Sequence, residues 1–497
     1  METSVRSSSW VIVVDNPKRW DFSLNDMGIA VVSARQYLTN PELADKRKLR
    51  VMNLCRSYAY QDNGYYVSLL AEARDHKPVP SVATIQDFKA PTVLRAMSSD
   101  LMPVIQNALK ALQSDRFTLS IYFGRNMAQR YELLCRKLSA LFPAPLIRAH
   151  FHRSEDGEWL LTNISPIAVK DIPDSHRDFM IEAARDFFAR RRPATRRRSP
   201  SRFDLAMLVD PSDKTPPSNE SALRKFEKAG EKMGVRVSRL DRDDYGEIAE
   251  YDGLFIRTTT SVEHFTYRFA RKAEAEGLAV IDDSLSILRC TNKVYLQEVL
   301  DRHHIPSPKS IIIHKDNLQA GLDKIGLPLI LKQPDSSFSL GVVKVRDRGE
   351  YEKATAGLLE NSNLLIAQEF LPTEFDWRIG VLDGEVIYAC RYWMALNHWQ
   401  IYNHSANKKN ETGGLVDCVP IQEVPSSILH DAVRAASLMG TSLYGVDLKY
   451  INEKPCVIEV NDNPSIDSGF EDHLLQENLY NRIMSSFLNR MEKRRKL

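Results

Sequence analysis

The segment GVDLKYINEKPCVIEVNDNP, residues 445–464, constrains the fold of this chain most strongly. Two apolar runs flank a turn centred near Glu453, which predicts two antiparallel strands joined in a hairpin. Asp447 and Glu459 lie at equal distances from Glu453 along the chain, so they face one another across the hairpin. Asn461 points to the same face because side chains alternate along a strand. Three oxygen donors therefore converge at one place.

Two opposed carboxylates repel each other unless a cation lies between them. Hard oxygen ligands select Mg²⁺, with Mn²⁺ as a second candidate, and such a metal commonly carries phosphate oxygens. The sequence thus predicts Asp447, Glu459 and Asn461 as metal ligands. The alternative is a set of polar residues on the exposed face of an ordinary hairpin. Apolar Val457 and Val460 favour a buried strand, and buried acids need a partner.

A second feature is LPLILKQPDSSFSLGVVKV, residues 327–345, which places Lys332 at the end of a buried strand before a loop of small residues. Ser336, Ser337, Ser339 and Gly341 would form a flap over phosphates, because small residues and free backbone N–H groups allow close approach. The alternative is an ordinary surface turn that happens to follow a lysine.

The segment LLIAQEFLPTEFDWRIGVLDGEVIYACRYW, residues 364–393, predicts a strand, a polar break and a hairpin that turns at Asp383-Gly384. The main chain from Gln368 to Leu371 would bond an adenine edge, and Glu374 or Asp376 would bond ribose hydroxyls.

Two arginines, Arg378 and Arg391, lie on the two arms of this hairpin. We expect them to project toward the same region as a phosphate clamp. Exposed sheet arginines are the alternative.

The domain organisation follows from length and one break in composition. At 497 residues the chain exceeds a single core, and its 43% hydrophobic and 27% charged residues are typical of folded proteins. The run RRRPATRRRSPSR, 190–202, predicts an exposed linker. The predicted fold class is α/β and α+β multidomain, with an accessory α/β domain at 1–189, a small parallel α/β domain at 203–290 and an α+β domain of two subdomains at 291–490.

The accessory domain shows strand-like runs at Trp10–Val14, Leu49–Leu54 and Phe117–Phe123, and helical periodicity at Asn126–Leu141 and Asp174–Arg190. The next domain alternates strand, helix and strand, which predicts a parallel sheet. The final segment, residues 472–491, predicts an amphipathic helix with a basic tail.

Charge and cysteine usage exclude several classes of protein. A net charge of +2 excludes general nucleic-acid binding, leaving only a local contact through the linker at 190–202. The six cysteines stand singly, without zinc-ligand or disulfide spacing. No apolar stretch resembles a secretion signal or a membrane span, so we expect a cytoplasmic protein without a membrane partner.

Taken in order, Lys293, Lys332, QEFL, FDWRIGVLDGEV, GVDL and EVNDNP resemble the ATP-grasp fold, most closely its RimK-type branch of amino-acid ligases. The resemblance covers about 203–490. The segment RSYAYQDNGYYVSLLAEARDHKP, residues 56–78, resembles the accessory domain in front of some RimK-like proteins.

The resemblance implies a role for each of these residues. Lys293, Lys332 and the flap with Ser339 would hold the ATP phosphates, and Gln368, Glu369, Phe370 and Leu371 would bind adenine. Asp376 with Glu374 would bind ribose, and Asp447, Glu459 and Asn461 would bind Mg²⁺. Arg378, Arg391 and Asn403 would act near the transferred phosphate. The flap has serines where many relatives have glycines, and HWQIYNHSANKKNETGG, residues 398–414, lacks the arginine that often precedes the active-site asparagine. These departures leave the substrate and Asn403 open.

The implied reaction joins a carboxylate to an amine through an acyl phosphate, with an unidentified carboxylate acceptor and an amino acid such as glutamate as donor. A peptide or protein substrate fits this chemistry, and an oligomer is compatible with it. Two alternatives stay open: an ATP-grasp kinase that stops at phosphoryl transfer to a hydroxyl, and a non-catalytic protein that binds nucleotide or RNA.

Overall fold

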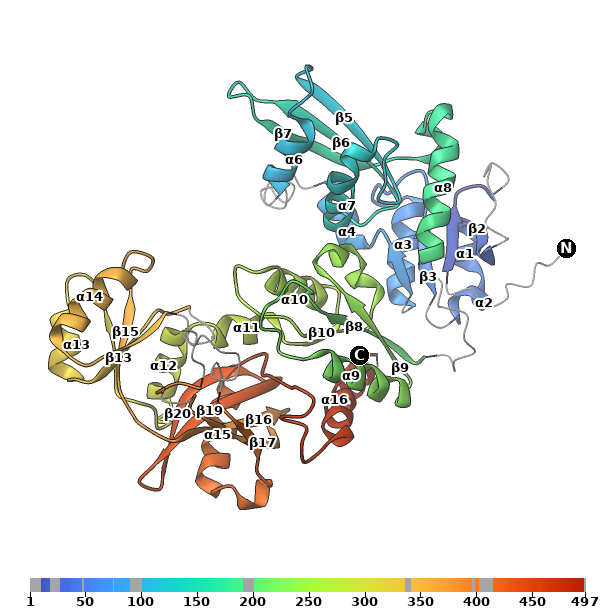
Figure 1. The fold of residues 1–497 in the computed structure, drawn as a ribbon. Helices are drawn as coiled ribbons and strands as arrows, with labels where there is room; N and C mark the ends of the chain where they lie inside the picture. The colour runs from blue at the N-terminus through green and yellow to red at the C-terminus, as the bar shows by residue number, and fades with distance from the viewer. Residues whose placement is uncertain are drawn as a thin grey trace. The chain divides into compact units, whose positions relative to one another are not determined.

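The computed structural model describes residues 10–17, 27–46, 49–74, 76–89, 101–190, 201–335, 341–395, 398–401 and 414–495. The chain divides into two compact units (Figure 1). The first comprises 1–198 with 243–250, and the second comprises 199–242 with 251–497.

The first unit contains a parallel sheet of order β2-β1-β3-β4 and an antiparallel sheet of order β5-β6-β7. The strands are β1 (Trp10–Val14), β2 (Ala30–Ser33), β3 (Arg50–Asn53), β4 (Lys77–Val79), β5 (Arg116–Tyr122), β6 (Leu146–Arg153) and β7 (Trp159–Pro166). The α-helices are α1 (Ala34–Thr39), α2 (Pro41–Ala44), α3 (Asn63–Ala73), α4 (Val82–Asp87), α6 (Met102–Leu109), α7 (Glu132–Leu141) and α8 (Asp174–Arg190). The three predicted strands and the predicted helix α8 are confirmed.

One predicted helix of this unit starts too early. Helix α7 begins at Glu132 instead of Asn126. The Asn126 side chain accepts a hydrogen bond from the Ala128 N–H at 2.8 Å and donates one to the Ser120 carbonyl at 2.7 Å. These local bonds compete with the helix and keep 126–128 in a turn.

The second unit begins with the predicted parallel sheet, which has the order β11-β10-β8-β9. Its elements are β8 (Phe203–Leu208), α9 (Glu220–Lys232), β9 (Val235–Leu240), β10 (Gly253–Ile256), α10 (Phe265–Ala275), β11 (Ala279–Ile281) and α11 (Ser284–Cys290).

Two antiparallel sheets follow, with the orders β12-β15-β13-β14 and β18-β17-β16-β19-β20. Their strands are β12 (Ser310–Ile313), β13 (Leu329–Lys332), β14 (Val342–Val345), β15 (Leu365–Glu369), β16 (Phe375–Leu382), β17 (Glu385–Trp393), β18 (Val416–Cys418), β19 (Leu443–Ile451) and β20 (Lys454–Asn461). The helices are α12 (Lys293–Arg302), α13 (Gln319–Lys324), α14 (Arg348–Leu358), α15 (Ser426–Met439) and α16 (Glu477–Arg495). The predicted α+β character of this part is confirmed.

The parallel sheet and the five-stranded sheet share one core. Leu205 and Phe255 of the first pack in the same cluster as Tyr388 and Cys390 of the second, together with Phe487 of α16. One apolar side of each sheet is therefore covered in this shared core.

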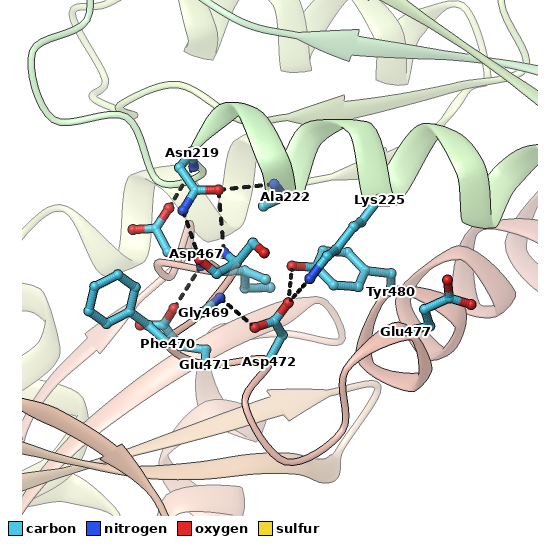
Figure 2. A network of polar contacts seen from close by, with 12 residues as sticks. Asn219, Ala222, Lys225, Asp467, Gly469, Phe470, Glu471, Asp472, Glu477 and Tyr480 are labelled. Carbon is cyan, nitrogen blue, oxygen red and sulfur yellow. Dashed lines mark hydrogen bonds and ion pairs between the residues drawn. The ribbon is translucent and has the colours of Figure 1, made fainter.

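The C-terminal helix starts later than predicted, at Glu477. Figure 2 shows the reason: residues 467–472 form a turn whose polar groups bond to α9 and α16. The Asp472 carboxylate accepts hydrogen bonds from the Gly469 N–H at 2.7 Å, the Tyr480 hydroxyl at 2.9 Å and the Lys225 ammonium at 2.5 Å. These bonds fix Asp472 in the turn before the helix.

The end of the arginine-rich run is folded, whereas 191–200 lie outside the described residues. The Arg202 side chain is exposed, as predicted for the linker, and its guanidinium pairs with Glu492 at 2.5 Å. Among the described residues, no helix is both long enough and apolar enough to cross a bilayer.

Candidate active site

A single row of side chains crosses the five-stranded sheet. Arg378 of β16 pairs with Asp447 of β19, and Asp447 pairs with Glu459 of β20. The predicted pairing of Asp447 with Glu459 is confirmed, and a β-bulge follows directly between Asp447 and Leu448. Cross-strand partners lie on the same face of a sheet, so a guanidinium and two carboxylates occupy neighbouring places on one face.

The Arg378 guanidinium donates from Nε and Nη2 to the two oxygens of Asp447, both at 2.7 Å. Both residues are buried, and the guanidinium also lies over the Tyr392 ring, 4.4 Å from its centroid. Burial raises the pKa of Asp447, and the Arg378 charge and hydrogen bonds oppose that rise. Asn461 donates to Asp447 Oδ2 at 3.3 Å, so the third predicted oxygen donor lies beside the first.

Two lysines face this row. Lys293 is the first residue of α12, and its Nζ lies 3.1 Å from Oε1 of Glu459. Lys332 ends β13, as predicted. Burial lowers the pKa of Lys332 to about 8, and the Lys293 and Lys449 charges act in the same direction, whereas Glu459 opposes them. Burial raises the pKa of Glu459, but Lys293 and Lys332 outweigh it and leave this pKa lowered.

These groups line a cavity of about 710 Å³. The sheet β12-β15-β13-β14 and the two residues after β15 contribute Ile330, Lys332, Val342 and 368–371. The five-stranded sheet contributes Arg378, Asp447, Lys449 and Glu459, and the loop after β10 contributes 259–263. This volume is in the range of pockets that hold cofactors and drug-sized ligands.

The predicted adenine-binding residues lie at the end of β15. Gln368 Nε2 donates to Ser310 Oγ at 2.9 Å, and Glu369 Oε1 accepts from the Lys309 N–H at 2.7 Å. The Phe370 ring lies 3.4 Å below the Lys344 ammonium. The Glu369 N–H is bonded to the Lys309 carbonyl at 2.9 Å. This N–H is therefore used within the sheet.

The two candidates for ribose binding differ in their surroundings. Asp376 lines the cavity and accepts hydrogen bonds from Thr373 Oγ1 at 3.0 Å and Lys449 Nζ at 2.6 Å. Glu374 is exposed and does not line the cavity. Sequence reasoning missed Lys449. The signal was available, since it lies two residues after Asp447 on a strand whose side chains alternate.

The expectation that Arg391 and Arg378 project to the same region is wrong. A β-bulge between Gly380 and Val381 shifts the register of β16 and β17, so Arg391 pairs with Trp377 while Arg378 pairs with Cys390. Neighbouring residues point to opposite faces, which places Arg391 away from the cavity. Its guanidinium instead donates from Nε to Asp417 at 3.0 Å.

A steric restriction at Gly380 accompanies this register shift. A Cβ at this position would lie 2.2 Å from the Tyr388 ring, so only glycine accommodates the cross-strand tyrosine. Asn403, Ser336, Ser337 and Ser339 lie outside the described residues.

A second part of the cavity carries polar groups that sequence reasoning did not single out. Asp462 is buried and lines the cavity, and its Oδ2 has no hydrogen-bond partner among the described residues. Oγ1 of Thr259, on the loop after β10, is likewise unpartnered in this described part. Burial raises the pKa of Asp462 to about 7, against a lowering hydrogen bond from Thr260. Asp462 lies inside the motif EVNDNP and could have been noticed there.

The donor set at the row fits a magnesium ion. In the described ranges, no three acidic, histidine or cysteine side chains are grouped as metal ligands. Mg²⁺ usually binds through one or two carboxylates plus substrate phosphates and water, and does not require an all-protein cage. Asp447, Glu459 and Asn461 provide such a partial oxygen set beside two lysines.

Lys332 is only partly exposed and its surroundings disfavour the charged form, so replacing it with an apolar residue should stabilise the nucleotide-free protein. The folded-state pKa of about 8 lies below the ordinary 10.5, so the stability contributed by this group rises with pH between these values and is lost below pH 8. We expect Lys332→Met to raise the free energy of unfolding at pH 7 by about 1–3 kcal/mol. Urea unfolding at pH 7 and pH 10 measures this.

The matched control is Lys353→Met on the exposed face of α14, which should change nothing. A loss of stability in Lys332→Met at pH 7 would contradict the reasoning.

Two family models match this chain. Residues 34–183 match the RimK-like ATPgrasp N-terminal domain, and residues 290–485 match the RimK-like ATP-grasp domain. A probable alpha-L-glutamate ligase of Aliivibrio fischeri is 27% identical over 225 residues, covering 44% of this chain and 71% of the relative. A probable alpha-L-glutamate ligase of Vibrio vulnificus is 26% identical over 225 residues, with the same two shares.

Among solved structures, a RimK domain protein of Sphaerobacter thermophilus aligns with 57% of this chain and 99% of its own, at 15% identity and a TM-score of 0.44. D-alanine–D-alanine ligase of Bacillus anthracis aligns with 59% and 99%, at 16% identity and a TM-score of 0.45.

Two family domains, in the order that the resemblance implies, thus match the accessory part and the nucleotide part of the chain. The chain is therefore a RimK-like ATP-grasp protein, and by enzyme class an ATP-dependent carboxylate-amine ligase.

Proposed function

We propose that this ligase phosphorylates a carboxylate with ATP and then transfers the acyl group to the amine of an amino acid, with glutamate as the first candidate. The observation that carries the proposal is the row of Arg378, Asp447 and Glu459, faced by Lys293 and Lys332 in one cavity. Relatives named as probable alpha-L-glutamate ligases support glutamate.

Phosphoryl transfer depends mainly on alignment and on neutralising charge, and the chain supplies both. Lys293 and Lys332 would bind phosphate oxygens from one side of the cavity. Asp447, Glu459 and Asn461 would hold Mg²⁺, for which Mn²⁺ is a candidate substitute, and the ion would shield the phosphate charge. Arg378 would then neutralise charge that develops on the transferred group.

The nucleotide base would lie against Phe370 at the end of β15, with Gln368 and Leu371 beside it. Asp376 would accept hydrogen bonds from ribose hydroxyls, since it already accepts from Thr373 and Lys449 at the same cavity wall. Glu374 is exposed outside the cavity and would not bind the ribose.

The incoming amino acid would occupy the second part of the cavity. Asp462 offers a carboxylate oxygen and Thr259 a hydroxyl, neither of which has a hydrogen-bond partner among the described residues. A carboxylate and a hydroxyl suit the ammonium group of an amino acid better than they suit a phosphate, because like charges repel. The carboxylate acceptor in this proposal is a peptide or protein terminus or a small acid.

Hydroxylamine trapping separates the ligase from the kinase alternative. We expect hydroxamate to form when the protein, MgATP, glutamyl peptides and hydroxylamine are mixed, because only an acyl phosphate reacts in this way. ADP release without hydroxamate, together with a stable phosphorylated product, would favour a kinase. Absence of ADP with every acceptor tested would favour a binding protein.

The cytoplasm is the compartment we propose. All six cysteines are free thiols in the structure, which is typical of proteins from a reducing compartment.

A further inference from the structure

The row that contains the active-site groups continues across the rest of the sheet. Arg378 pairs with Cys390 of β17, and Cys390 pairs with Cys418 of β18. Glu459, Asp447, Arg378, Cys390 and Cys418 therefore stand side by side on one face, one from each of the five strands. Two thiols end a row that begins with two carboxylates.

The thiols are already close. The Sγ atoms of Cys390 and Cys418 lie 3.2 Å apart. In this ladder the Val419 N–H donates to Ala389, and the Trp393 N–H donates to Leu415. Alternate pairs are hydrogen-bonded in an antiparallel ladder, so the cysteines form the intervening, non-hydrogen-bonded pair. Cα atoms in such a pair are about 4.5 Å apart, within the range of about 4.4–6.8 Å that a disulfide requires.

The two thiols differ in their environments. Cys390 is fully buried, whereas Cys418 is partly exposed. A hydrogen bond from the Cys390 thiol lowers the pKa of Cys418, and backbone N–H groups of His473 and Leu474 act in the same direction. The pKa of Cys390 is raised by the same thiol contact and by burial. Cys418 is thus the thiol suited to react first, and Cys390 the one suited to resolve the product.

We propose that Cys390 and Cys418 form a redox-active pair that a hydroperoxide closes into a disulfide, and that closure reduces turnover at the neighbouring nucleotide site through Arg378. In the first step the Cys418 thiolate attacks a peroxide oxygen, the O–O bond breaks, and sulfenic acid and an alcohol or water result. In the second step the Cys390 sulfur attacks the sulfenic sulfur, the S–S bond forms, and the Cys390 proton leaves with the hydroxyl as water. Two thiols are oxidised by two electrons, and one peroxide is reduced.

Coupling to the site follows from the contacts of Cys390. Its cross-strand neighbour Arg378 also lies over Tyr392, two residues along the same strand as Cys390. A bond of about 2.05 Å must replace the present 3.2 Å separation of the two sulfurs, so the Cys390 side chain has to turn toward Cys418 at its place beside Arg378. Cys418 also donates to the Phe470 carbonyl at 3.0 Å, in the turn that Figure 2 shows, and loses that hydrogen bond on oxidation. The part of this inference that concerns turnover rests on the proposed function.

The chemical test needs no substrate. The reduced full-length protein is treated with hydrogen peroxide, and its free thiols are counted with a maleimide before digestion without reductant. Trypsin places Cys390 in the peptide that ends at Arg391 and Cys418 in the one that ends at Arg434. We expect loss of two thiols, a cross-link between these peptides, and reversal by dithiothreitol.

Cys418→Ser should keep all its remaining thiols under the same dose. The matched control is Cys456→Ser, which removes a half-buried thiol of β20 whose pKa burial raises to about 12 and which faces Lys449 in the ladder. This variant should cross-link as the wild type does. Six thiols retained in the oxidised wild type, or sulfinic acid at Cys418 without a cross-link, would overturn the proposed pair.

The functional test compares ADP formation before and after oxidation. We expect at least a fivefold decrease in the wild type and in Cys456→Ser, restored by dithiothreitol, and no decrease in Cys418→Ser. A cross-linked protein with unchanged turnover would overturn the coupling to Arg378. If the reduced protein forms no ADP with any acceptor, the proposed function fails while the cross-link result stands on its own.

Discussion

Asp447→Asn combined with Glu459→Gln is expected to reduce ADP formation by a factor on the order of 10³ or more. In the proposed function, a row without two charged carboxylates would not bind Mg²⁺ firmly, and the triphosphate would lose the charge neutralisation that phosphoryl transfer requires. Both residues lie at adjacent places on one face of the hairpin, so the double variant tests the converging oxygen set itself. The measurement is a coupled assay of ADP release at several Mg²⁺ concentrations.

The matched control for this variant lies in the same hairpin. Glu453→Gln removes an exposed carboxylate at the turn, where it cannot reach the row, and should leave turnover within about twofold. Because Asp447→Asn leaves Arg378 without its ion partner, Glu459→Gln alone serves as a second variant with a smaller structural effect. Turnover above a tenth of the wild-type rate in the folded double variant would contradict the assigned metal ligands.

Arg378→Met is expected to lower ADP formation by a factor on the order of 10³, as removal of an arginine that neutralises a phosphoryl group does in other enzymes. The same change leaves the buried Asp447 carboxylate without its bidentate partner, which costs about 3–5 kcal/mol of stability. Arg378→Lys keeps the charge but not the two parallel bonds, so it should be intermediate in both respects. Thermal unfolding and steady-state kinetics measure the two effects separately.

The control is Arg391→Met, on the opposite face of the same sheet. Its guanidinium pairs with Asp417 and is partly exposed, so turnover should change by less than about tenfold. Equal losses of turnover in Arg378→Met and Arg391→Met would show that the two faces do not differ in function. This result would contradict the placement of the two arginines on opposite faces, which follows from the pairing of Arg391 with Trp377.

The hairpin of β19 and β20 and the hairpin of β16 and β17 show how much of the strand register can be predicted from the local sequence. In the hairpin of β19 and β20 the strands pair Ile451 with Lys454 next to the turn, and a bulge between Asp447 and Leu448 then shifts the register by one residue. Counting from a centre at Glu453 found the pairing of Asp447 with Glu459 because that centre matches the register beyond the bulge. In the hairpin of β16 and β17 the same counting places Arg378 and Arg391 on one face. The bulge at Gly380 and Val381 inserts one residue and reverses that result.

A bulge is difficult to predict from sequence because its cause lies in packing. Gly380 meets the Tyr388 ring, which belongs to the core shared with the parallel sheet. The alternation of apolar residues alone does not show which strand takes the extra residue. The same shift puts Cys390 opposite Arg378. Counting residues from the turn therefore could not predict that the two thiols lie in this row.

The amino-acid sequence by itself determined the chemistry available to this protein: strands from apolar runs, a hairpin with acids on both arms, and lysines at strand and helix ends, since these depend on neighbours in the chain. Only the tertiary structure decided which face each arginine occupies and that two distant cysteines meet. It also decided that Asp462 is buried with one oxygen that has no hydrogen-bond partner in the described part of the chain. Such features depend on strand register and on packing between segments far apart in the chain, where a shift of one residue turns every side chain to the other face.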